Sequence, residues 1–243
     1  MSISDDRLMI CTGWCAHLEG HNNKARSALQ NESLYLGSVW LPAILHQVEP
    51  KAVMVYNSLC DIPAAAGLLR SDIVNMVYAP RPARELPYRH DWAAAIMVAA
   101  GYAMANNLDL MFIEQDCLVY RLKDFLDFAR ISNHSICYGY GEGASLYNNW
   151  AANSLIYCSW SLLDEFMTAL AQTKDISDGE VKLEERFHDR VMSVGAGEYF
   201  RPWPWGVDRL RPLPQGDDPF YAQQLTDGEL DYMTAKIMEG QND

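Results

Sequence analysis

Short apolar runs alternate with helical segments through the first half of the chain. Four runs have the length and composition of buried strands, at residues 8–11, 52–56, 73–78 and 108–113. Helices are expected between them, at residues 38–48, 62–69 and 92–104. Strands that alternate with helices in this way predict an α/β fold whose mostly parallel sheet is buried on both faces and flanked by helices.

Individual polar residues predict where several helices and strands begin or end. Asp91 is expected to cap the helix over residues 92–104, because its side chain can accept hydrogen bonds from the first unpaired amides. Asn106-Asn107 is expected to end that helix, since asparagine tolerates the left-handed conformation found at helix ends. The first strand is expected to end in a turn at Thr12-Gly13-Trp14.

The second half of the chain is less regular. Its pattern predicts strands over residues 135–140 and 153–158, helices over 161–171 and 181–191, and a glycine-rich loop over 139–143. That loop could shape an acceptor pocket or be an ordinary surface turn. The tail after Phe200 is rich in Pro, Trp and Arg, and no repeat or domain boundary is evident. We therefore expect one domain over residues 1–243.

Composition and charge narrow the class of ligand. Of the 243 residues 49% are hydrophobic, enough for a full core, and the net charge is −13. Non-specific nucleic-acid binders instead carry a basic excess. Basic residues cluster locally around Arg89 and between Arg201 and Arg211, which suits a small anionic ligand. The chain lacks the roughly 18-residue apolar run of a membrane span and the basic start of a secretory signal, so we expect a cytoplasmic protein.

Two carboxylates follow the fourth apolar run, in Glu114-Gln115-Asp116. Ligands of open α/β sheets lie beyond the carboxyl ends of the strands, and residues two apart on a continuing strand point the same way. Carboxylate oxygens placed there suit Mg²⁺ or Mn²⁺, with a substrate phosphate completing the coordination. Acidic residues also simply punctuate strand ends, so the spacing by itself leaves both interpretations open.

Other active-site signatures are absent from the sequence. It contains no GxSxG, no HExxH, and no GxGxxG after a strand. The patterns of α/β-hydrolases, zinc metalloproteases and dinucleotide-binding enzymes are therefore missing.

The Glu114-Gln115-Asp116 segment resembles the DxD motif of GT-A fold glycosyltransferases, with Glu in place of the first Asp. Arg89-His90-Asp91-Trp92 and the alanine-rich helix after it resemble the family's segment before that motif. Thr12-Gly13-Trp14 is similar in position to its first nucleotide-binding loop, and the resemblance covers about residues 7–120. It implies a single GT-A-like, Rossmann-like domain in which Glu114 and Asp116 hold Mn²⁺ or Mg²⁺ on the diphosphate of a nucleotide-sugar donor.

The same resemblance implies further site residues. Donor contacts would come from Thr12, Gly13, Trp14, Arg89, Asp91 and Glu114, with Arg89 neutralising a phosphate beside a helix N-terminus. In this family a later carboxylate often acts as catalytic base, which here gives Glu184 or Glu185. A later histidine sometimes joins the metal, which here gives His188, four residues after Glu184 on the same helix face.

Together these features predict a metal-dependent glycosyltransferase that moves a sugar from a nucleotide-diphosphate donor to an acceptor hydroxyl. Residues of about 1–120 would bind the donor, and residues of about 121–243 would form the acceptor half and a C-terminal arm. The acceptor stays open among a glycan, a protein, a small molecule and a hydroxylated nucleic-acid base. One alternative is a nucleotidyltransferase, whose glycine-rich basic loop is reduced here to the single Gly13. Another is a non-catalytic nucleotide-sugar-binding module.

The six cysteines stand at positions 11, 15, 60, 117, 137 and 158. Cys11, Cys117 and Cys137 fall in apolar strand-like runs, where a thiol packs as a small hydrophobe, and no cysteine–histidine spacing suggests zinc. We predict that all six are thiols rather than disulfides, as in a reducing compartment. Thiol counting on denatured, unreduced protein should give all six. A count lowered by one or two disulfides would contradict the cytoplasmic assignment.

Overall fold

The computed structural model describes the chain in ten ranges: residues 3–14, 36–57, 72–78, 91–114, 117–119, 122–131, 136–141, 150–172, 191–194 and 221–223. Most of the predicted first half lies within them. The helix expected over residues 62–69 and most of the helix expected over 181–191 lie outside them.

One large sheet dominates the described structure. Its seven strands stand in the order β3-β2-β1-β4-β7-β6-β8, and β7 is antiparallel to both of its neighbours while the other pairs are parallel. The bounds are β1 Ile3–Trp14, β2 Val48–Asn57, β3 Val74–Tyr78, β4 Asp109–Ile113, β6 Ile136–Gly141, β7 Trp150–Cys158 and β8 Val191–Val194. A second sheet pairs β5 (Cys117–Val119) antiparallel with β9 (Tyr221–Gln223). The expectation of a mostly parallel central sheet is confirmed.

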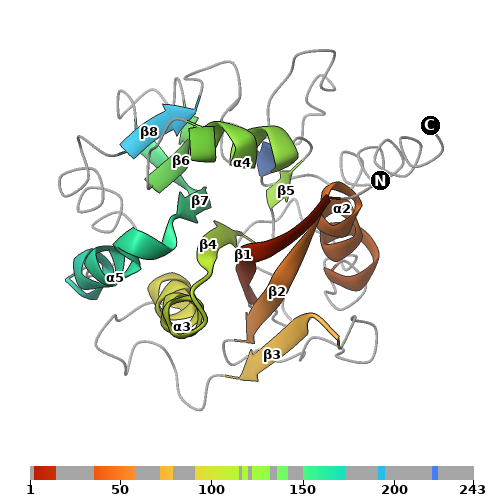
Figure 1. Cartoon of the computed structure of the whole chain (residues 1–243), viewed down its shortest axis with the longest axis horizontal. Coiled ribbons are helices and arrows are strands. Elements are labelled where there is room, and N and C mark those ends of the chain that lie inside the picture. The colour runs from red at the N-terminus through yellow and green to blue at the C-terminus, as the bar shows by residue number, and fades with distance from the viewer. Residues whose placement is uncertain are drawn as a thin grey trace, which may run out of the picture.

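Helices cover both faces of this sheet. Figure 1 shows α3 and α5 on one side of the row of strands, and α2 and α4 on the other. The bounds are α2 Leu41–Gln47 after a π-helical turn η2 Leu36–Trp40, α3 Asp91–Ala105, α4 Leu122–Ile131, and α5 Leu163–Ala171 after a 3₁₀ turn η5 Trp160–Leu162. None of the helices in the described ranges has the length and apolar character that crossing a bilayer requires.

Strand β4 lies at the centre of two hydrophobic cores. All five of its residues are buried. Leu110 and Phe112 belong to the core shared with α3 and α5, whereas Met111 and Ile113 belong to the core shared with α2 and α4. Alternate residues of a strand point to opposite faces, so a strand covered on both faces needs apolar side chains on both, as β4 has from Leu110 to Ile113. Each large apolar side chain buried in this way stabilises the fold by about 2 kcal/mol.

Helix α3 packs closely against the sheet because its buried face is built from alanine. Its fully buried alanines are Ala93, Ala94, Ala95, Ala99, Ala100 and Ala103. The helix ends where predicted, since Asn107 adopts a positive φ of 56° directly after it. Asp91 is the first residue of the helix rather than the residue before it.

Three sequence expectations about element boundaries are wrong. Thr12-Gly13-Trp14 is not a turn, because β1 continues through it in register with β2 as far as Trp14 opposite Asn57. Residues 139–141 are not part of a loop, since they complete β6 and pair with β7. Val191 is not the end of a helix but the first residue of β8.

The structure also contains elements that the sequence analysis did not name. Helix α4 follows β5, and its buried residues are Leu122, Phe125, Leu126 and Ala129. Their spacing is that of one apolar helix face. The short strands β5 and β9 depend on each other, because a strand of three residues is defined by its partner rather than by its own pattern.

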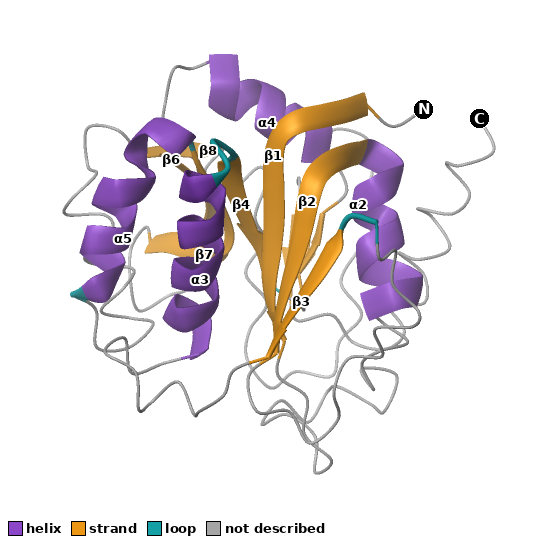
Figure 2. Cartoon of the chain, turned by 60° about the horizontal axis from the view of Figure 1, so that its bottom comes forward, coloured by secondary structure: helices purple, strands orange, loops and turns teal. Residues whose placement is uncertain are grey.

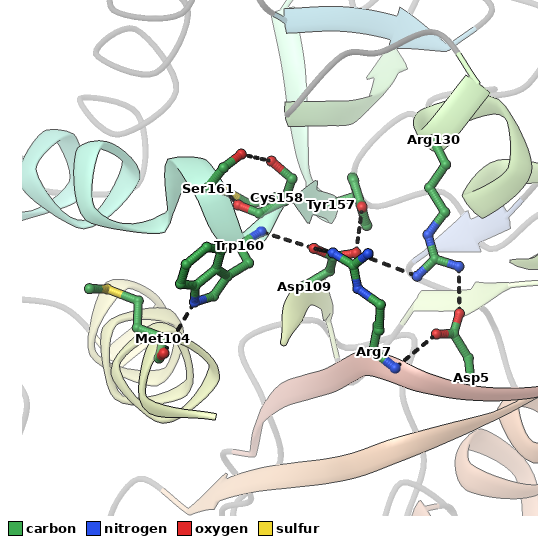
Figure 3. Close-up of polar contacts among 10 residues, drawn as sticks. Asp5, Arg7, Met104, Asp109, Arg130, Tyr157, Cys158, Trp160 and Ser161 are labelled. Carbon is green, nitrogen blue, oxygen red and sulfur yellow. Dashed lines mark hydrogen bonds and ion pairs between the residues drawn. The ribbon is translucent and has the colours of Figure 1, made fainter. Parts of the chain in front are cut away.

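Asp109 lies at the centre of a polar cluster at the amino end of β4 (Figure 3). Its carboxylate is buried, and it accepts hydrogen bonds from the Tyr157 hydroxyl at 3.0 Å and from the Trp160 backbone N–H at 2.9 Å. The Arg130 guanidinium lies 3.6 Å from the same carboxylate and also forms an ion pair with Asp5. The cluster therefore joins β1, β4, β7 and α4 through side chains that are far apart in the sequence.

The charges in this cluster follow from its geometry. Burial lowers the pKa of the Arg130 guanidinium, but hydrogen bonds to Asp5 and Tyr157 raise it by more, so the group stays charged. Burial, together with the nearby Asp109 carboxylate, raises the pKa of the Tyr157 phenol, so the hydroxyl keeps the proton that it donates. The cluster is thus a neutral donor and a cation arranged around carboxylates, which is a structural arrangement rather than an acid–base pair.

We expect Asp109→Ala to lower the free energy of unfolding by about 3 kcal/mol, because it leaves a buried hydroxyl and a backbone amide without their acceptor and removes one of the two carboxylates beside the Arg130 guanidinium. Tyr157→Phe removes the hydroxyl but leaves the Asp109 carboxylate with its other partners, and it should cost about 1 kcal/mol. Urea denaturation of both variants measures the difference. Equal effects of the two substitutions would show that Asp109 is not the centre of the cluster.

Candidate functional site

The strand order makes the space between the carboxyl ends of β1 and β4 the expected place for a ligand. From β1 the chain crosses to β2 by way of α2 on one face of the sheet, and from β3 it crosses to β4 by way of α3 on the other face. Strand β1 pairs with both β2 and β4. Ligands of open α/β sheets collect where neighbouring crossovers leave toward opposite faces, at the carboxyl ends of the strands. This fold therefore has its switch point between β1 and β4.

The carboxyl ends of four parallel strands meet at that edge. Figure 2 shows β1, β2 and β3 converging there. Trp14, Asn57 and Tyr78 end these strands in register with one another. Cys11 pairs with Phe112 of β4, so continuing the same register sets Gly13 opposite Glu114. The end of β1 and the first residue after β4 therefore lie at the same edge of the sheet.

The N-terminal part of α3 lies beside the same edge. A Cβ atom added to Gly13 would stand 3.4 Å from the Cβ of Ala95, one turn into α3. The end of β1 and the beginning of α3 are therefore in contact. A helix N-terminus carries partial positive charge, which favours an anion at this edge of the sheet.

Glu114 lies just beyond β4 and is partly buried. Its carbonyl oxygen accepts a hydrogen bond of 3.0 Å from the Cys117 backbone N–H, which links the end of β4 to the first residue of β5. The expectation that Glu114 and Asp116 point the same way required a continuing strand, and β4 ends at Ile113. That reason for the pairing does not apply, and Asp116 lies outside the described ranges.

Thr12 and Cys11 form the buried floor below this edge. Thr12 is fully buried, and its hydroxyl donates to the Gly13 carbonyl oxygen at 3.2 Å. Burial raises the pKa of the Cys11 thiol well above its usual range, and it does the same for Cys158. A thiol held in its protonated form is a poor nucleophile, so neither cysteine is suited to covalent catalysis. Cys11, Cys117 and Cys158 form no disulfide.

The structure places only part of the predicted site. Thr12, Gly13 and Glu114 are described in full, and Trp14 and Asp91 are described as backbone. Arg89, Asp116, Glu184, Glu185 and His188 lie outside the described ranges. Within the described ranges no group of three or more His, Cys, Asp and Glu side chains is close enough to hold a metal ion. The Glu114 carboxylate is an oxygen group of the hard type that Mg²⁺ and Mn²⁺ prefer.

Two residues at this edge were not assigned a role from the sequence. Asn57 and Tyr78 end β2 and β3, and the Tyr78 side chain is 55% exposed. An exposed aromatic ring at a ligand edge can stack on a base or a sugar ring. The signal in the sequence was their position as the last residues of two apolar runs, which parallel strands bring to one edge.

The sequence matches no known protein family and no curated protein. Among solved structures, the chain is similar to 4-diphosphocytidyl-2C-methyl-D-erythritol synthase from Anaerococcus prevotii, with 9% identity, a TM-score of 0.52 and 96% of each chain covered. It is also similar to a Bacillus anthracis protein named as a glucose-1-phosphate thymidylyltransferase, with 8% identity, a TM-score of 0.51 and 95% of each chain covered.

A third similar structure is the bifunctional glycosyltransferase WbbM, with 10% identity, a TM-score of 0.49 and 78% of this chain covered. This chain spans 39% of the WbbM chain. At such identities a likeness establishes the fold alone. The chain is an α/β protein whose mostly parallel central sheet is flanked by helices, and that fold is shared along nearly the full length of two of these structures.

The contact between Gly13 and α3 predicts a graded response to larger side chains. We expect Gly13→Ala to change the free energy of unfolding by less than about 1 kcal/mol, because its methyl group would meet Ala95 at ordinary van der Waals distance. Gly13→Leu should cost about 2 kcal/mol, since the longer side chain must displace α3. Thermal unfolding of both variants checks this, and a Gly13→Ala variant as unstable as Gly13→Leu would contradict the packing described.

Proposed function

We propose that this chain is a transferase that binds a nucleotide diphosphate ligand across the carboxyl ends of β1 and β4, and that it moves a sugar from a nucleotide-diphosphate donor to an acceptor hydroxyl. The observation that carries the proposal is the β1–β4 pairing. Its register ends with Cys11 opposite Phe112, so both strands lead toward the switch point of the sheet, which supports a ligand site near Gly13 and Glu114. The beginning of α3 adds partial positive charge at the same edge, where a diphosphate would lie.

The resemblance to GT-A glycosyltransferases supplies the finer roles. Glu114 and Asp116 would hold Mn²⁺ or Mg²⁺, and Glu114 fits because its carboxylate is a hard oxygen ligand at the carboxyl edge. When bound, the metal would offset the charge that develops on the departing diphosphate. Carboxylates facing a diphosphate without a cation would repel it, so donor binding should require the metal.

Side chains of this protein would position the donor and the acceptor. Arg89 would pair with a phosphate next to the N-terminus of α3, which begins at Asp91. Trp14 and the exposed Tyr78 would offer rings at the nucleoside end of the site. Glu184 or Glu185 would take the proton of the acceptor hydroxyl if the anomeric centre is inverted, and His188 would join the metal.

A nucleotidyltransferase is the second candidate. It is favoured by the two structures that match over 95–96% of both chains, one of which is named as a thymidylyltransferase. Against it, residues 12–14 continue β1 as a regular strand and contain one glycine, whereas such enzymes carry a glycine-rich basic loop after the first strand. Two assays separate the candidates. Release of a nucleoside diphosphate from nucleotide-sugars supports sugar transfer, and release of pyrophosphate from nucleoside triphosphates with a sugar phosphate supports nucleotidyl transfer.

Asp116→Asn tests the metal role. We expect it to lower Mn²⁺-dependent cleavage of the nucleotide-sugar by more than about a hundredfold. Mutating a residue that only hydrogen-bonds a metal ligand already lowers metal affinity or activity by about ten- to a hundredfold, and a ligand itself should matter more. Its free energy of unfolding should stay within about 0.5 kcal/mol of the wild type, because asparagine keeps the size and shape of the aspartate side chain.

Asp127→Asn is the matched control, since it makes the same chemical change at an exposed position of α4. It should turn over as the wild type does. If Asp116→Asn also turns over normally with saturating donor, Asp116 is not a metal ligand.

A further inference from the structure

Helix α3 carries an exposed apolar face opposite the alanines that meet the sheet. Val98, Gly101, Tyr102 and Ala105 recur at the spacing of one helix face, and each is exposed or partly exposed. Val98 is 39% exposed and Tyr102 is 38% exposed. These two and Trp160 are three of the four large hydrophobic side chains that are exposed in the described ranges. We call Val98, Gly101, Tyr102 and Ala105 the outer face of α3.

Gly101 lies in the middle of this outer face, and the fold of a single chain gives no reason for a glycine there. Inside a helix, glycine is less stable than alanine because it loses more backbone freedom on folding. A Cβ atom added to Gly101 would meet nothing within 4 Å, so no neighbouring group of the chain needs the space. A large side chain or a backbone that packs against the helix from outside would explain the glycine.

Trp160 extends the apolar surface at the C-terminal end of α3 (Figure 3). Its indole Nε1–H donates to the Met104 carbonyl oxygen at 3.1 Å, and its backbone N–H donates to the Asp109 carboxylate at 2.9 Å. The ring is therefore held in place while 44% of the residue stays exposed. An aromatic ring that is fixed before binding loses little entropy on association, which is typical of the anchor residues of interfaces.

The distribution of charge narrows the kind of partner. The chain carries a net charge of −13, whereas its sequence from Trp92 to Asn107 contains no charged residue. A helix that binds a membrane surface presents Lys and Arg beside its apolar face, and α3 has neither. A basic protein attracted to this acidic chain would gain nothing from a face without carboxylates. Two copies of the chain repel each other over acidic surfaces, but they can meet here without opposing like charges.

The shape of the outer face also suits a second copy. A twofold interface brings the same patch of both copies together, so the patch must offer both a protrusion and a space that receives it. Tyr102 supplies an exposed ring, and the open position above Gly101 supplies the space beside it. The outer face of α3 is therefore complementary to itself.

We propose that the outer face of α3 is a dimer interface, in which the α3 helices of two copies cross antiparallel and Tyr102 of each copy packs over Gly101 of the other. Val98 and Trp160 add apolar contact on either side. The interface is small, so we expect a dissociation constant of about 10 µM. This inference goes beyond the proposed function and does not rest on it, because association requires neither donor nor metal.

Sedimentation of the full chain between about 1 and 100 µM tests the association, and the wild type should pass from monomer to dimer over this range. Tyr102→Asp and Tyr102→Lys should each raise the dissociation constant by about thirtyfold or more, because each removes an aromatic anchor and opposes like charges. Both variants should melt as the wild type does at concentrations where it is monomeric, since substitutions of exposed residues change stability little.

An equimolar mixture of Tyr102→Asp and Tyr102→Lys shows whether this face meets its own copy. Opposite charges then face each other across the twofold axis, so the mixture should associate more tightly than either variant alone. Gly101→Leu is an independent variant that fills the space above the helix. It should weaken the dimer without lowering the melting temperature of the dilute chain, because leucine is the better helix former and its Cβ meets no neighbour.

Tyr78→Lys is the matched control, because it makes the same change at another exposed tyrosine, at the carboxyl end of β3. It should associate as the wild type does. A wild type that stays monomeric at about 100 µM overturns the proposal, as it would if another part of the same chain covered this face. A dimer that the Tyr102 variants leave intact, a mixture no tighter than its components, or a Tyr78→Lys variant that dissociates like Tyr102→Lys also overturns it.

Discussion

The parallel pairing of β1 with β4 joins the two halves of the sheet, with Leu8 opposite Asp109 and Cys11 opposite Phe112. The chain leaves β1 through α2 on one face of the sheet and reaches β4 through α3 on the other, so both faces of β4 are covered and all of its side chains are buried. Because these two crossovers run on opposite faces, neither helix covers the carboxyl ends of β1 and β4, where a ligand can lie. The core and the candidate site thus follow from one strand pairing.

The two ends of β4 make different kinds of contact. At its amino end, Asp109 gathers a hydroxyl, a backbone amide and the Arg130 guanidinium into a cluster that joins four elements. At its carboxyl end the chain leaves the sheet through Glu114, whose carbonyl is held by Cys117. The polar contacts that stabilise the fold are therefore at the amino end of β4. In α/β sheets ligands bind at the carboxyl ends of the strands, which these contacts do not occupy.

The strands and helices of the first half could be predicted because their signals are local: an apolar run, a helical spacing, an asparagine at a helix end. The apolar face of α4 was equally visible in the spacing of Leu122, Phe125, Leu126 and Ala129, and it was overlooked. The continuation of β1 to Trp14 could not be predicted, because its pairing with β2 decides it. The contacts of Asp109 and Gln47 span 48 to 75 residues, and no local pattern encodes them.

The central claim is that a nucleotide diphosphate binds at the carboxyl edge between β1 and β4 through a divalent metal. Anomalous diffraction from Mn²⁺ in crystals grown with a nucleoside diphosphate locates the ion and the ligand together. The account predicts Mn²⁺ within about 2.2 Å of an Asp116 carboxylate oxygen, a normal coordination distance, with the diphosphate between the ends of β1 and β4. A diphosphate bound far from Asp116, or one bound equally well in excess chelator, would contradict it.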